Sequence, residues 1–471
     1  MLVVSAPRGI PERLRTALTG SPGTPLILLG SFEVENRWAE GEPGLPTVAL
    51  AGSRAIVNRM DEFGLLLAGA GDHVVLKAPP DDGYLEYLSS LGLSLPRMLT
   101  VADQDPQRVI TEDVLADTDL TAALAELAAR NAQLWPHGVS DLEERLAKRC
   151  GLPLASAPAV ICKTVNSKIY SRLAADATGL PQPPGVVCRD LDELAAACDR
   201  ARQWLSAGRT VALKDAYGVS GKGILVIREE RRLGQVQAMC ARRARKRGNP
   251  RVGIVVEEWV PKQTDLNYQF TIDRDGAVHF DFVKEALTAG GVHQGHRMPA
   301  RLTTGQVAEL RQAAAALGSR LAADGYFGVV GVDALLTTAG LLYPVIEINA
   351  RNNMSTYQEG LRQQFFAAGQ TVLAKQFPVR LRRRVSFAEL RHRLGEVLLR
   401  PGASYGLLVN NFATVNAAAP PGEQDPGARA TFEGRLYGII IAGSAGQASA
   451  IDRETTTRLD ELTAAQEAPD E

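Results

Sequence analysis

The sequence predicts a multidomain protein that combines α/β and α+β architecture. Its 471 residues are enough for roughly two to four domains. Short apolar runs alternate with helical patterns through the first part of the chain, and this alternation continues to Phe377-Pro378, where the texture changes. We therefore predict an N-terminal α/β domain at 1–158, a central domain at 159–378 and a small α+β module at 379–471.

The composition excludes several function classes. Hydrophobic residues make up 45% and charged residues 22% of the chain, as in ordinary globular proteins. The net charge of −1 gives no overall field for a polyanion, so no nucleic acid partner is expected. We find no run of about 18 apolar residues and no signal peptide pattern, and we expect a cytoplasmic protein with no membrane partner. The five cysteines form no CxxC pair, which argues against a disulfide scaffold and a structural zinc site.

Local patterns place the individual elements. In the N-terminal domain, apolar runs predict strands at 24–29, 46–50 and 73–77, and helical spacing of Ala, Leu and Glu predicts a helix at 117–134. In the central domain a helix opens at 166–168 and ends before the Gly- and Pro-rich segment 179–185. The other predicted helices are 191–207, one that ends in the basic run 242–247, 304–324 and 387–399; the other predicted strands are 210–214, 224–227, 252–257, 343–349, 405–415 and 430–441.

The strongest chemical signal lies in two strands near the end of the central domain. Residues two apart on a strand share a face, so Glu347, Asn349 and Arg351 are expected to point one way, and a turn at 337–340 brings Asp333 alongside. Two carboxylates and an amide oxygen suit Mg²⁺, which completes its shell with water and phosphate oxygens. A neighbouring arginine can neutralise charge on a transferring phosphoryl group. The alternative is a polar rim where two strands reach solvent, but three polar side chains on one face favour a metal site.

A glycine-rich loop follows a buried strand that ends at Lys214. The loop carries Ser220, Gly221, Lys222 and Gly223, and its backbone N–H groups could wrap phosphates. It is not a Walker loop, because Gly223 stands where that motif requires Ser or Thr. A flexible β-turn with two surface lysines remains an alternative.

A third candidate is an apolar strand that ends in two acids and a tryptophan. The main chain of Glu258 and Val260 could bind an adenine edge, with Glu257 and Trp259 beside it, and Asp265 could accept hydrogen bonds from ribose hydroxyls. An ordinary strand end with solvated carboxylates is at least as compatible with the local sequence. Farther along, Arg297 or His296 within the glycine-containing segment 288–299 could position a donor carboxylate, although a surface turn fits that segment equally well.

The order of these motifs resembles the ATP-grasp superfamily, over roughly residues 160–378. The resemblance implies two α+β subdomains that grip ATP, with a lid at about 165–250, an α/β domain in front and the C-terminal module behind. It implies that Lys168 and Lys214 contact phosphates, that 257–260 bind adenine, and that Asp333, Glu347 and Asn349 hold magnesium. Over the whole chain, the sequence is also similar to the group of peptide ligases that includes the one of pheganomycin biosynthesis.

This resemblance implies an ATP-dependent carboxylate–amine ligase of antibiotic biosynthesis. Such an enzyme forms an acyl phosphate from a small, guanidino-bearing carboxylic acid and couples it to the amine of a peptide, releasing ADP and phosphate. Arg351 would stabilise developing charge, while Lys222 and Ser220 would close over the phosphates. A homodimer is a fold-level expectation. Two rival hypotheses remain: a small-molecule kinase on the same fold, and a nucleotide-binding regulator without turnover.

Overall fold

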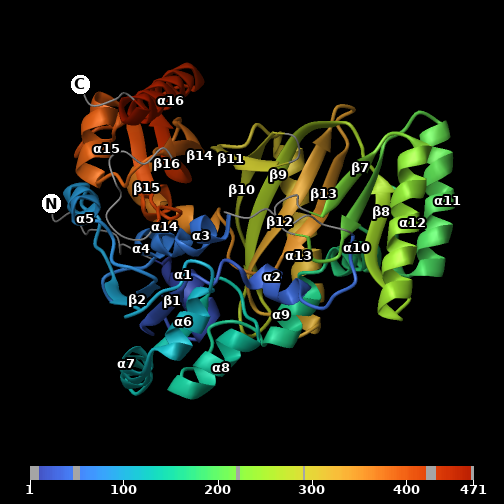
Figure 1. Ribbon diagram of the computed structural model, residues 1–471, viewed down its shortest axis with the longest axis horizontal. Coiled ribbons are helices and arrows are strands. Elements are labelled where there is room, and N and C mark those ends of the chain that lie inside the picture. Colours follow the sequence, from blue (N-terminus) through green and yellow to red (C-terminus); the bar gives the residue numbers. More distant parts are fainter. Residues whose placement is uncertain (1–9, 46–52, 219–222, 290–291, 421–430, 468–471) are drawn as a thin grey trace.

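The computed structural model describes residues 10–45, 53–218, 223–289, 292–420 and 431–467. Three sheets organise these residues: a four-stranded parallel sheet, a four-stranded antiparallel sheet and an eight-stranded sheet. In Figure 1 the parallel sheet lies at the lower left, the small antiparallel sheet at the right, and the large sheet runs from the centre to the upper left. The predicted strand at 46–50 lies outside the described residues.

The N-terminal domain is a parallel sheet in the order β3-β2-β1-β4, covered by short helices. Each of β1 and β2 is an apolar run buried over its whole length, as expected for a parallel sheet covered on both faces. Its strands are β1 (Leu26–Leu29), β2 (His73–Leu76), β3 (Arg97–Thr100) and β4 (Gln133–Pro136). Its helices are α1 (Glu12–Thr19), α2 (Val34–Ala39), α3 (Ser53–Asn58), η1 (Met60–Phe63), α4 (Gly64–Leu67), α5 (Asp82–Ser90), α6 (Ile110–Ala116), α7 (Thr118–Ala128) and α8 (Asp141–Cys150).

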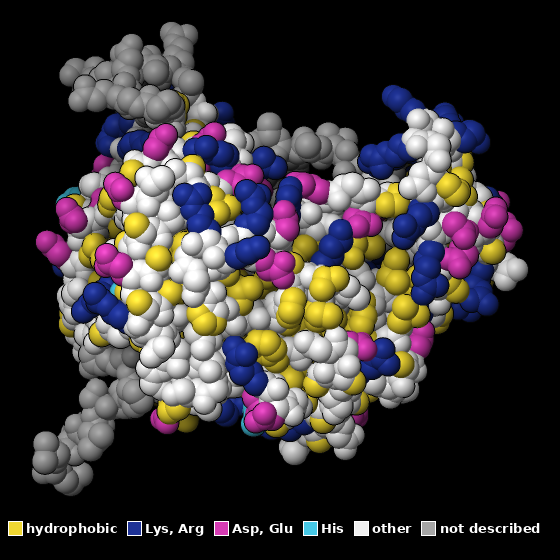
Figure 2. Space-filling model, turned by 90° about the horizontal axis from the view of Figure 1, so that it is seen from below, with side chains coloured by type: hydrophobic (Ala, Val, Ile, Leu, Met, Phe, Trp, Pro, Cys, Tyr) yellow, Lys and Arg dark blue, Asp and Glu magenta, His cyan; other side chains and the backbone are white. Residues whose placement is uncertain are grey.

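The small subdomain, residues 185–258, is an antiparallel sheet in the order β5-β8-β6-β7 with two long helices on one side. Its strands are β5 (Gly185–Asp190), β6 (Val211–Asp215), β7 (Ile224–Ile227) and β8 (Arg251–Glu258), and its helices are α11 (Leu191–Ser206) and α12 (Glu230–Arg247). Asp190 caps α11 by accepting hydrogen bonds from two backbone N–H groups. The predicted basic run ends α12, where exposed cations favour the helix C-terminus. Lys and Arg side chains gather over this subdomain, at the right of Figure 2.

The large sheet has the order β13-β12-β9-β10-β11-β14-β16-β15. Its strands are β9 (Lys262–Ile272), β10 (Val278–Ala289), β11 (Val292–Met298), β12 (Gly328–Thr337), β13 (Leu342–Asn349), β14 (Thr371–Leu381), β15 (Gly406–Asn411) and β16 (Phe432–Ala442). Alternate residues of β9, among them Tyr268 and Phe270, pack in one core with Leu317 of α13 (Thr304–Ala323). The intervening polar residues therefore lie on the opposite face of the sheet. The helices α9 (Ala159–Val165) and α10 (Lys168–Thr178) complete this region.

The C-terminal residues continue the same large sheet. The boundary predicted at 378 falls inside β14, which pairs with β11 on one side and β16 on the other. The elements around these strands are η2 (Thr356–Gln358), α14 (Glu359–Phe365), α15 (Phe387–Leu394), η3 (Gly395–Val397), η4 (Ala413–Val415) and α16 (Ala445–Glu467). Within the described ranges, no helix is long and apolar enough to cross a bilayer.

Three predicted elements extended too far. The helix predicted at 117–134 ends at Ala128, because Asn131 adopts a positive φ of 62° and the chain then enters β4. The helix predicted at 387–399 ends at Leu394, before Gly395 with its φ of 56°. The strand predicted at 405–415 ends at Asn411, because the next two backbone N–H groups donate to the buried Glu62 carboxylate at 2.6 and 2.7 Å.

A short segment of the N-terminal domain, residues 41–45, crosses to the small subdomain; we name it the strap. Leu45 is buried in the core of that subdomain, and Arg243 donates hydrogen bonds to the carbonyl oxygens of Gly44 and Leu45. The Gly253 N–H donates to the Pro43 carbonyl oxygen at 2.8 Å. The Leu45 N–H donates to the carboxylate of Asp215, at the end of the strand that precedes the glycine-rich loop. The small subdomain is thus held by a segment from a different domain.

Candidate active site

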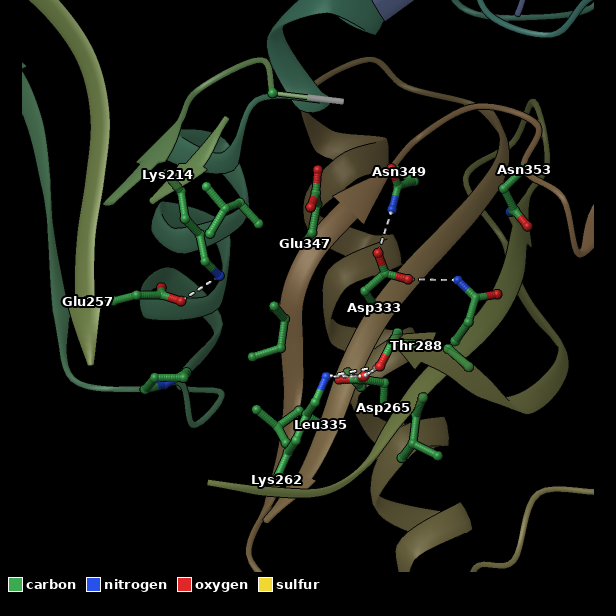
Figure 3. Close-up of a pocket in the computed structure, with 18 of the residues that line it drawn as sticks. Lys214, Glu257, Lys262, Asp265, Thr288, Asp333, Leu335, Glu347, Asn349 and Asn353 are labelled. Atoms are coloured by element: carbon green, nitrogen blue, oxygen red, sulfur yellow. Dashed lines mark hydrogen bonds and ion pairs between the residues drawn. The ribbon is translucent and has the colours of Figure 1, made fainter. Parts of the chain in front are cut away.

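A cavity of about 290 Å³ lies between the small subdomain and the polar face of the large sheet. Of the predicted site residues, those that line it are Lys214, Glu257, Glu258, Trp259, Val260, Asp265, Asp333, Glu347, Asn349 and Arg351. In Figure 3, Lys214 and Glu257 lie on one side, and Asp333, Glu347 and Asn349 rise from the sheet on the other. Side chains from distant parts of the sequence therefore converge on one cavity.

The two predicted metal-binding acids lie directly opposite each other. Asp333 on β12 is the register partner of Glu347 on β13, and the Asn349 amide donates to Asp333 Oδ2 at 3.3 Å. On the other side Asn267 of β9 donates to Asp333 Oδ1 at 2.9 Å. Burial raises the pKa of Asp333 to about 6, and the like charge of Glu347 adds to this effect. Two close carboxylates and an amide create a site that a divalent cation would stabilise.

Lys168 connects this acidic pair to the glycine-rich loop. Its helix begins where predicted, since the Ser167 hydroxyl accepts the Tyr170 N–H as an N-cap. The Lys168 ammonium is buried and donates to Glu347 Oε1 at 2.6 Å and to the Gly218 carbonyl oxygen at 2.7 Å. Although Lys168 is not among the residues that line the cavity, its charge acts on Glu347, which does line it.

Lys214 is also ion-paired with an acid of the predicted nucleotide site. Its Nζ lies 2.5 Å from Glu257 Oε1, and Arg172 of α10 lies 3.3 Å from the other oxygen of the same carboxylate. Glu257 therefore receives two cations and holds Lys214 at the cavity wall. Both members of the Lys214–Glu257 pair are more than nine-tenths buried, where such a pair is effective only with good geometry.

The segment after β8 departs in one respect from the predicted adenine contacts. The Glu258 N–H donates to the Pro184 carbonyl oxygen at 2.8 Å, and the Trp259 N–H donates to Thr210 at 2.8 Å. Neither N–H is therefore available to a ligand. Within the described part of the chain, the Val260 N–H has no hydrogen-bond acceptor. An adenine edge would thus be read by the Val260 N–H and by carbonyl oxygens, beside apolar side chains such as Ile346.

Asp265 belongs to a small polar cluster at the cavity wall. Its Oδ2 accepts a hydrogen bond from the Thr288 hydroxyl at 2.6 Å and pairs with Lys262. Figure 3 shows these three side chains together, below Asp333 in this view. The second oxygen of Asp265 has no hydrogen bond from a described residue, so the predicted ribose contact is compatible with the geometry.

Arg351 is held by a residue that the sequence did not reveal. Its guanidinium donates from Nε and Nη2 to Glu35 Oε1, at 3.0 and 2.6 Å, and from Nη2 to Asn349 Oδ1 at 3.0 Å. Glu35 belongs to α2 of the N-terminal domain and lines the cavity. Arg351 therefore lies between the acids of the large sheet and the N-terminal domain.

Five further predicted residues are not placed at the cavity by the described structure. Ser220, Gly221 and Lys222 lie outside the described residues. Gly223 has a φ of 131° that favours glycine, and its carbonyl oxygen accepts the Asp215 N–H at 2.8 Å, but it does not line the cavity. Arg297 instead donates to Glu285 Oε2 at 2.9 Å, and Arg301 binds the same carboxylate. The proposed contact of Arg297 with a donor carboxylate therefore has no support from its position.

Sequence reasoning missed several polar residues that line the cavity. They are Glu35, Lys262, Asn267, Thr288 and Asn353. Asn267 carried a usable signal, because it is one of the polar residues that alternate with apolar ones along β9 and so lie on one face of the strand. His296 was considered as a positioning residue, and it lies 3.2 Å from the Ser355 hydroxyl, which donates to Asn267 at 2.9 Å. Glu35 carried no local signal, since it lies on a helix of six residues with charged neighbours.

The cavity fits a nucleotide better than a protein-bound metal alone. Across the described ranges, no group of three or more His, Cys, Asp or Glu side chains forms a candidate metal site. Asp333, Glu347 and Asn349 supply a partial oxygen shell, as Mg²⁺ requires when phosphate oxygens and water provide the remaining ligands. The cations Lys168 and Lys214 lie beside these acids, where phosphate charge needs compensation.

Two family models match the chain. The Pre ATP-grasp domain model matches residues 60–152, and the model of the carbamoyl-phosphate synthase L chain, ATP binding domain, matches residues 168–357. The second match begins at Lys168 and extends past Asn349, so it contains both constellations of the cavity. The chain belongs to the ATP-grasp superfamily and carries a pre-ATP-grasp domain in front.

A curated relative narrows the class. The [butirosin acyl-carrier protein]–L-glutamate ligase of Niallia circulans is 26% identical over 324 residues, which cover 69% of this chain and 71% of the relative. The protein is therefore an ATP-using enzyme of the ligase kind.

Solved structures agree on the fold. The complex of biotin carboxylase from Campylobacter jejuni with β-γ-ATP aligns with a TM-score of 0.51 at 14% identity, over 94% of this chain and 95% of that one. The N5-carboxyaminoimidazole synthase of Aspergillus clavatus, in complex with ADP and 5-aminoimidazole ribonucleotide, gives a TM-score of 0.51 at 12% identity, over 93% and 99%. The predicted ATP-grasp fold is confirmed.

Proposed function

We propose that the protein activates a carboxylic acid as an acyl phosphate and couples it to the amino group of a peptide, releasing ADP and phosphate. The observation that carries this proposal is the convergence of Asp333, Glu347 and Asn349 with Lys168 and Lys214 around one cavity. This set can neutralise a triphosphate and align its terminal phosphoryl group. The similarity of the whole chain to natural-product peptide ligases suggests the peptide as acceptor and a small guanidino-bearing acid as donor.

Each residue has a role in the proposed reaction. Lys214 binds phosphate oxygens as a point charge, and Lys168 holds the Glu347 carboxylate in place through their ion pair. Asp333, Glu347 and Asn349 would hold magnesium, whose positive charge would offset the charge that develops on the phosphoryl group. Arg351 stabilises the negative charge that develops as phosphoryl transfer and amide formation proceed.

The expected course is two displacements in one cavity. The donor carboxylate oxygen attacks the terminal phosphorus of ATP, ADP leaves, and an acyl phosphate forms. The acceptor nitrogen then attacks the acyl carbon, and phosphate leaves with the electron pair of the broken C–O bond. No step requires a nucleophilic side chain, which is consistent with five buried cysteines. Burial also raises the pKa of Cys162 and Cys188 to about 12, so these thiols are poor nucleophiles.

The decisive experiment is an acid screen with hydroxylamine. Purified protein, ATP and Mg²⁺ are incubated with a panel that includes L-glutamate, L-arginine and small guanidino acids, and hydroxamates are detected by mass spectrometry. Formation of a hydroxamate together with ADP supports carboxylate activation, and replacing hydroxylamine by triglycine then tests for the amide. ADP release without hydroxamate would indicate a kinase, and AMP release would indicate adenylation; either result would refute the proposal. No turnover with any acid would favour a nucleotide-binding regulator.

A further inference from the structure

The N-terminal domain contributes one carboxylate to the nucleotide cavity. Glu35 lies on α2, close to the end of β1, and its side chain is 19% exposed. It lines the same cavity as Asp333 and Glu347, although it lies some 300 residues away in the sequence. The phosphate-binding residues come from the small subdomain and the large sheet, so Glu35 adds a group from a third part of the molecule.

The two oxygens of Glu35 are used unequally. Oε1 accepts both hydrogen bonds from Arg351, at 3.0 and 2.6 Å, whereas Oε2 accepts none from any described residue. Arg351 Nη2 also donates to Asn349 Oδ1 at 3.0 Å, so a single guanidinium nitrogen links Glu35 to the proposed magnesium ligands. Oε2 therefore belongs to a carboxylate of the cavity wall that shares its arginine with a proposed magnesium ligand.

Two other Arg–carboxylate pairs in the protein use both oxygens of the acid. Arg15 donates to both oxygens of the buried Asp72, at 2.6 and 2.8 Å. Arg37 donates to both oxygens of Asp141, at 2.8 and 2.7 Å. This two-by-two arrangement is the stable form of such a pair. Glu35 departs from it, and its second anionic oxygen, to which no described residue donates, is open to a donor on a bound ligand.

We propose that Glu35 Oε2 receives the ammonium group of the acceptor and takes a proton from it. This inference rests on the proposed ligase function and deepens it by naming the amine-binding residue. The reacting group of the donor is a carboxylate, which Glu35 would repel, whereas the reacting group of the acceptor enters as a cation that matches an open anionic oxygen. The pair with Arg351 fixes the Glu35 side chain, so the ammonium would meet a positioned base.

The proton balance of the coupling step then closes. The acceptor enters as an ammonium ion, and one proton passes to Glu35 Oε2, which frees the nitrogen lone pair. The nitrogen forms a C–N bond with the acyl carbon, and the C–O bond to phosphate breaks. The departing phosphate keeps that electron pair and takes the second proton from nitrogen. Glu35 finally returns its proton to solvent.

A comparison of two acceptors tests this role in the intact protein. Hydroxylamine is largely unprotonated at neutral pH and needs no base, whereas the terminal amine of triglycine has an ordinary pKa of about 7.7–8.0. Both acceptors are assayed with the acid that gives the strongest hydroxamate signal in the wild-type screen. The variant is Glu35→Gln, which keeps an oxygen acceptor for Arg351 but removes the charge. The control is Glu40→Gln, beside the same helix, where an exposed carboxylate pairs with Arg37.

At pH 7, Glu35→Gln is expected to lower triglycine coupling on the order of 100-fold while hydroxamate formation is retained. At pH 9 the deficit in triglycine coupling should narrow, because the free amine then predominates. Glu40→Gln should leave both reactions unchanged. Equal loss of both reactions would reduce Glu35 to a positioning residue for Arg351, and unchanged triglycine coupling would remove its role; either result overturns the proposal. Absence of hydroxamate in the wild type would instead refute the ligase function itself.

Discussion

Replacement of Lys168 by methionine tests the connection between the acidic pair and the glycine-rich loop. The Lys168 ammonium is 5% exposed and donates to Glu347 Oε1 at 2.6 Å and to the Gly218 carbonyl oxygen at 2.7 Å. A hydrogen bond to a charged group contributes about 1.5–3 kcal/mol. If one such contribution is lost from the transition state, kcat/KM for ATP should fall about 10- to 150-fold, since 1.4 kcal/mol corresponds to a factor of ten.

The assay is ADP release at varied ATP concentration, combined with calorimetric unfolding without nucleotide. A matched control is Lys375→Met, on β14 away from the cavity. This change also removes a lysine–carboxylate contact of 2.6 Å, between Lys375 and Asp452. Both partners of that pair are about one-quarter exposed, so the control should cost at most about 1 kcal/mol of stability and no activity. Unchanged kcat/KM for ATP in Lys168→Met, or an equal loss in both variants, would refute the reasoning.

Three further predictions follow from buried groups. Asp333→Asn should raise the melting temperature without nucleotide, because it removes a buried charge next to the like charge of Glu347. The same change should lower the maximal rate at least about 100-fold, because it removes a magnesium ligand. A lower melting temperature would contradict this prediction. Burial lowers the pKa of Lys284 to about 7. Between that pH and the higher pKa of lysine in the unfolded chain, the unfolded state binds one more proton than the folded state. The free energy of unfolding should therefore rise with pH over this range. Lys284→Met should flatten this dependence in calorimetric scans, and an unchanged slope would refute the assignment. Leu45→Ala should cost about 2–5 kcal/mol of stability in the small subdomain, measured by hydrogen exchange, and uniform destabilisation of the whole chain would argue against a local role.

The sequence predicted most of the cavity because its signals were local. Asp333 and Glu347 stand on strands joined by a recognisable turn, so their pairing followed from strand periodicity. Lys214 ends a buried strand, and Lys168 follows an N-cap serine; both positions follow from rules that span a few residues. Strand periodicity and helix capping depend on a few neighbouring residues, so they can be recognised without knowledge of the tertiary structure.

The missed features depend on contacts between distant segments. Glu35 meets Arg351 only after the N-terminal domain packs on the large sheet, and nothing in its own neighbourhood marks it. Arg297 was assigned to a substrate from residue type alone, but the neighbouring strand presents Glu285, and that carboxylate binds its guanidinium. The available Val260 N–H emerged because the structure shows which neighbouring N–H groups are already bonded.

Because the strap packs in the small subdomain, that subdomain cannot move independently of the N-terminal domain. The Leu45 side chain of the strap is buried in the core of that subdomain, and the strap backbone makes hydrogen bonds with Gly253 and Asp215. A swing of the subdomain away from ATP would pull on the segment that follows α2, the helix that bears Glu35. Release of ADP and entry of the next amine would then be coupled to the same movement of the subdomain. A fragment lacking the first domain would also carry an open hydrophobic slot where Leu45 belongs, and should be poorly soluble.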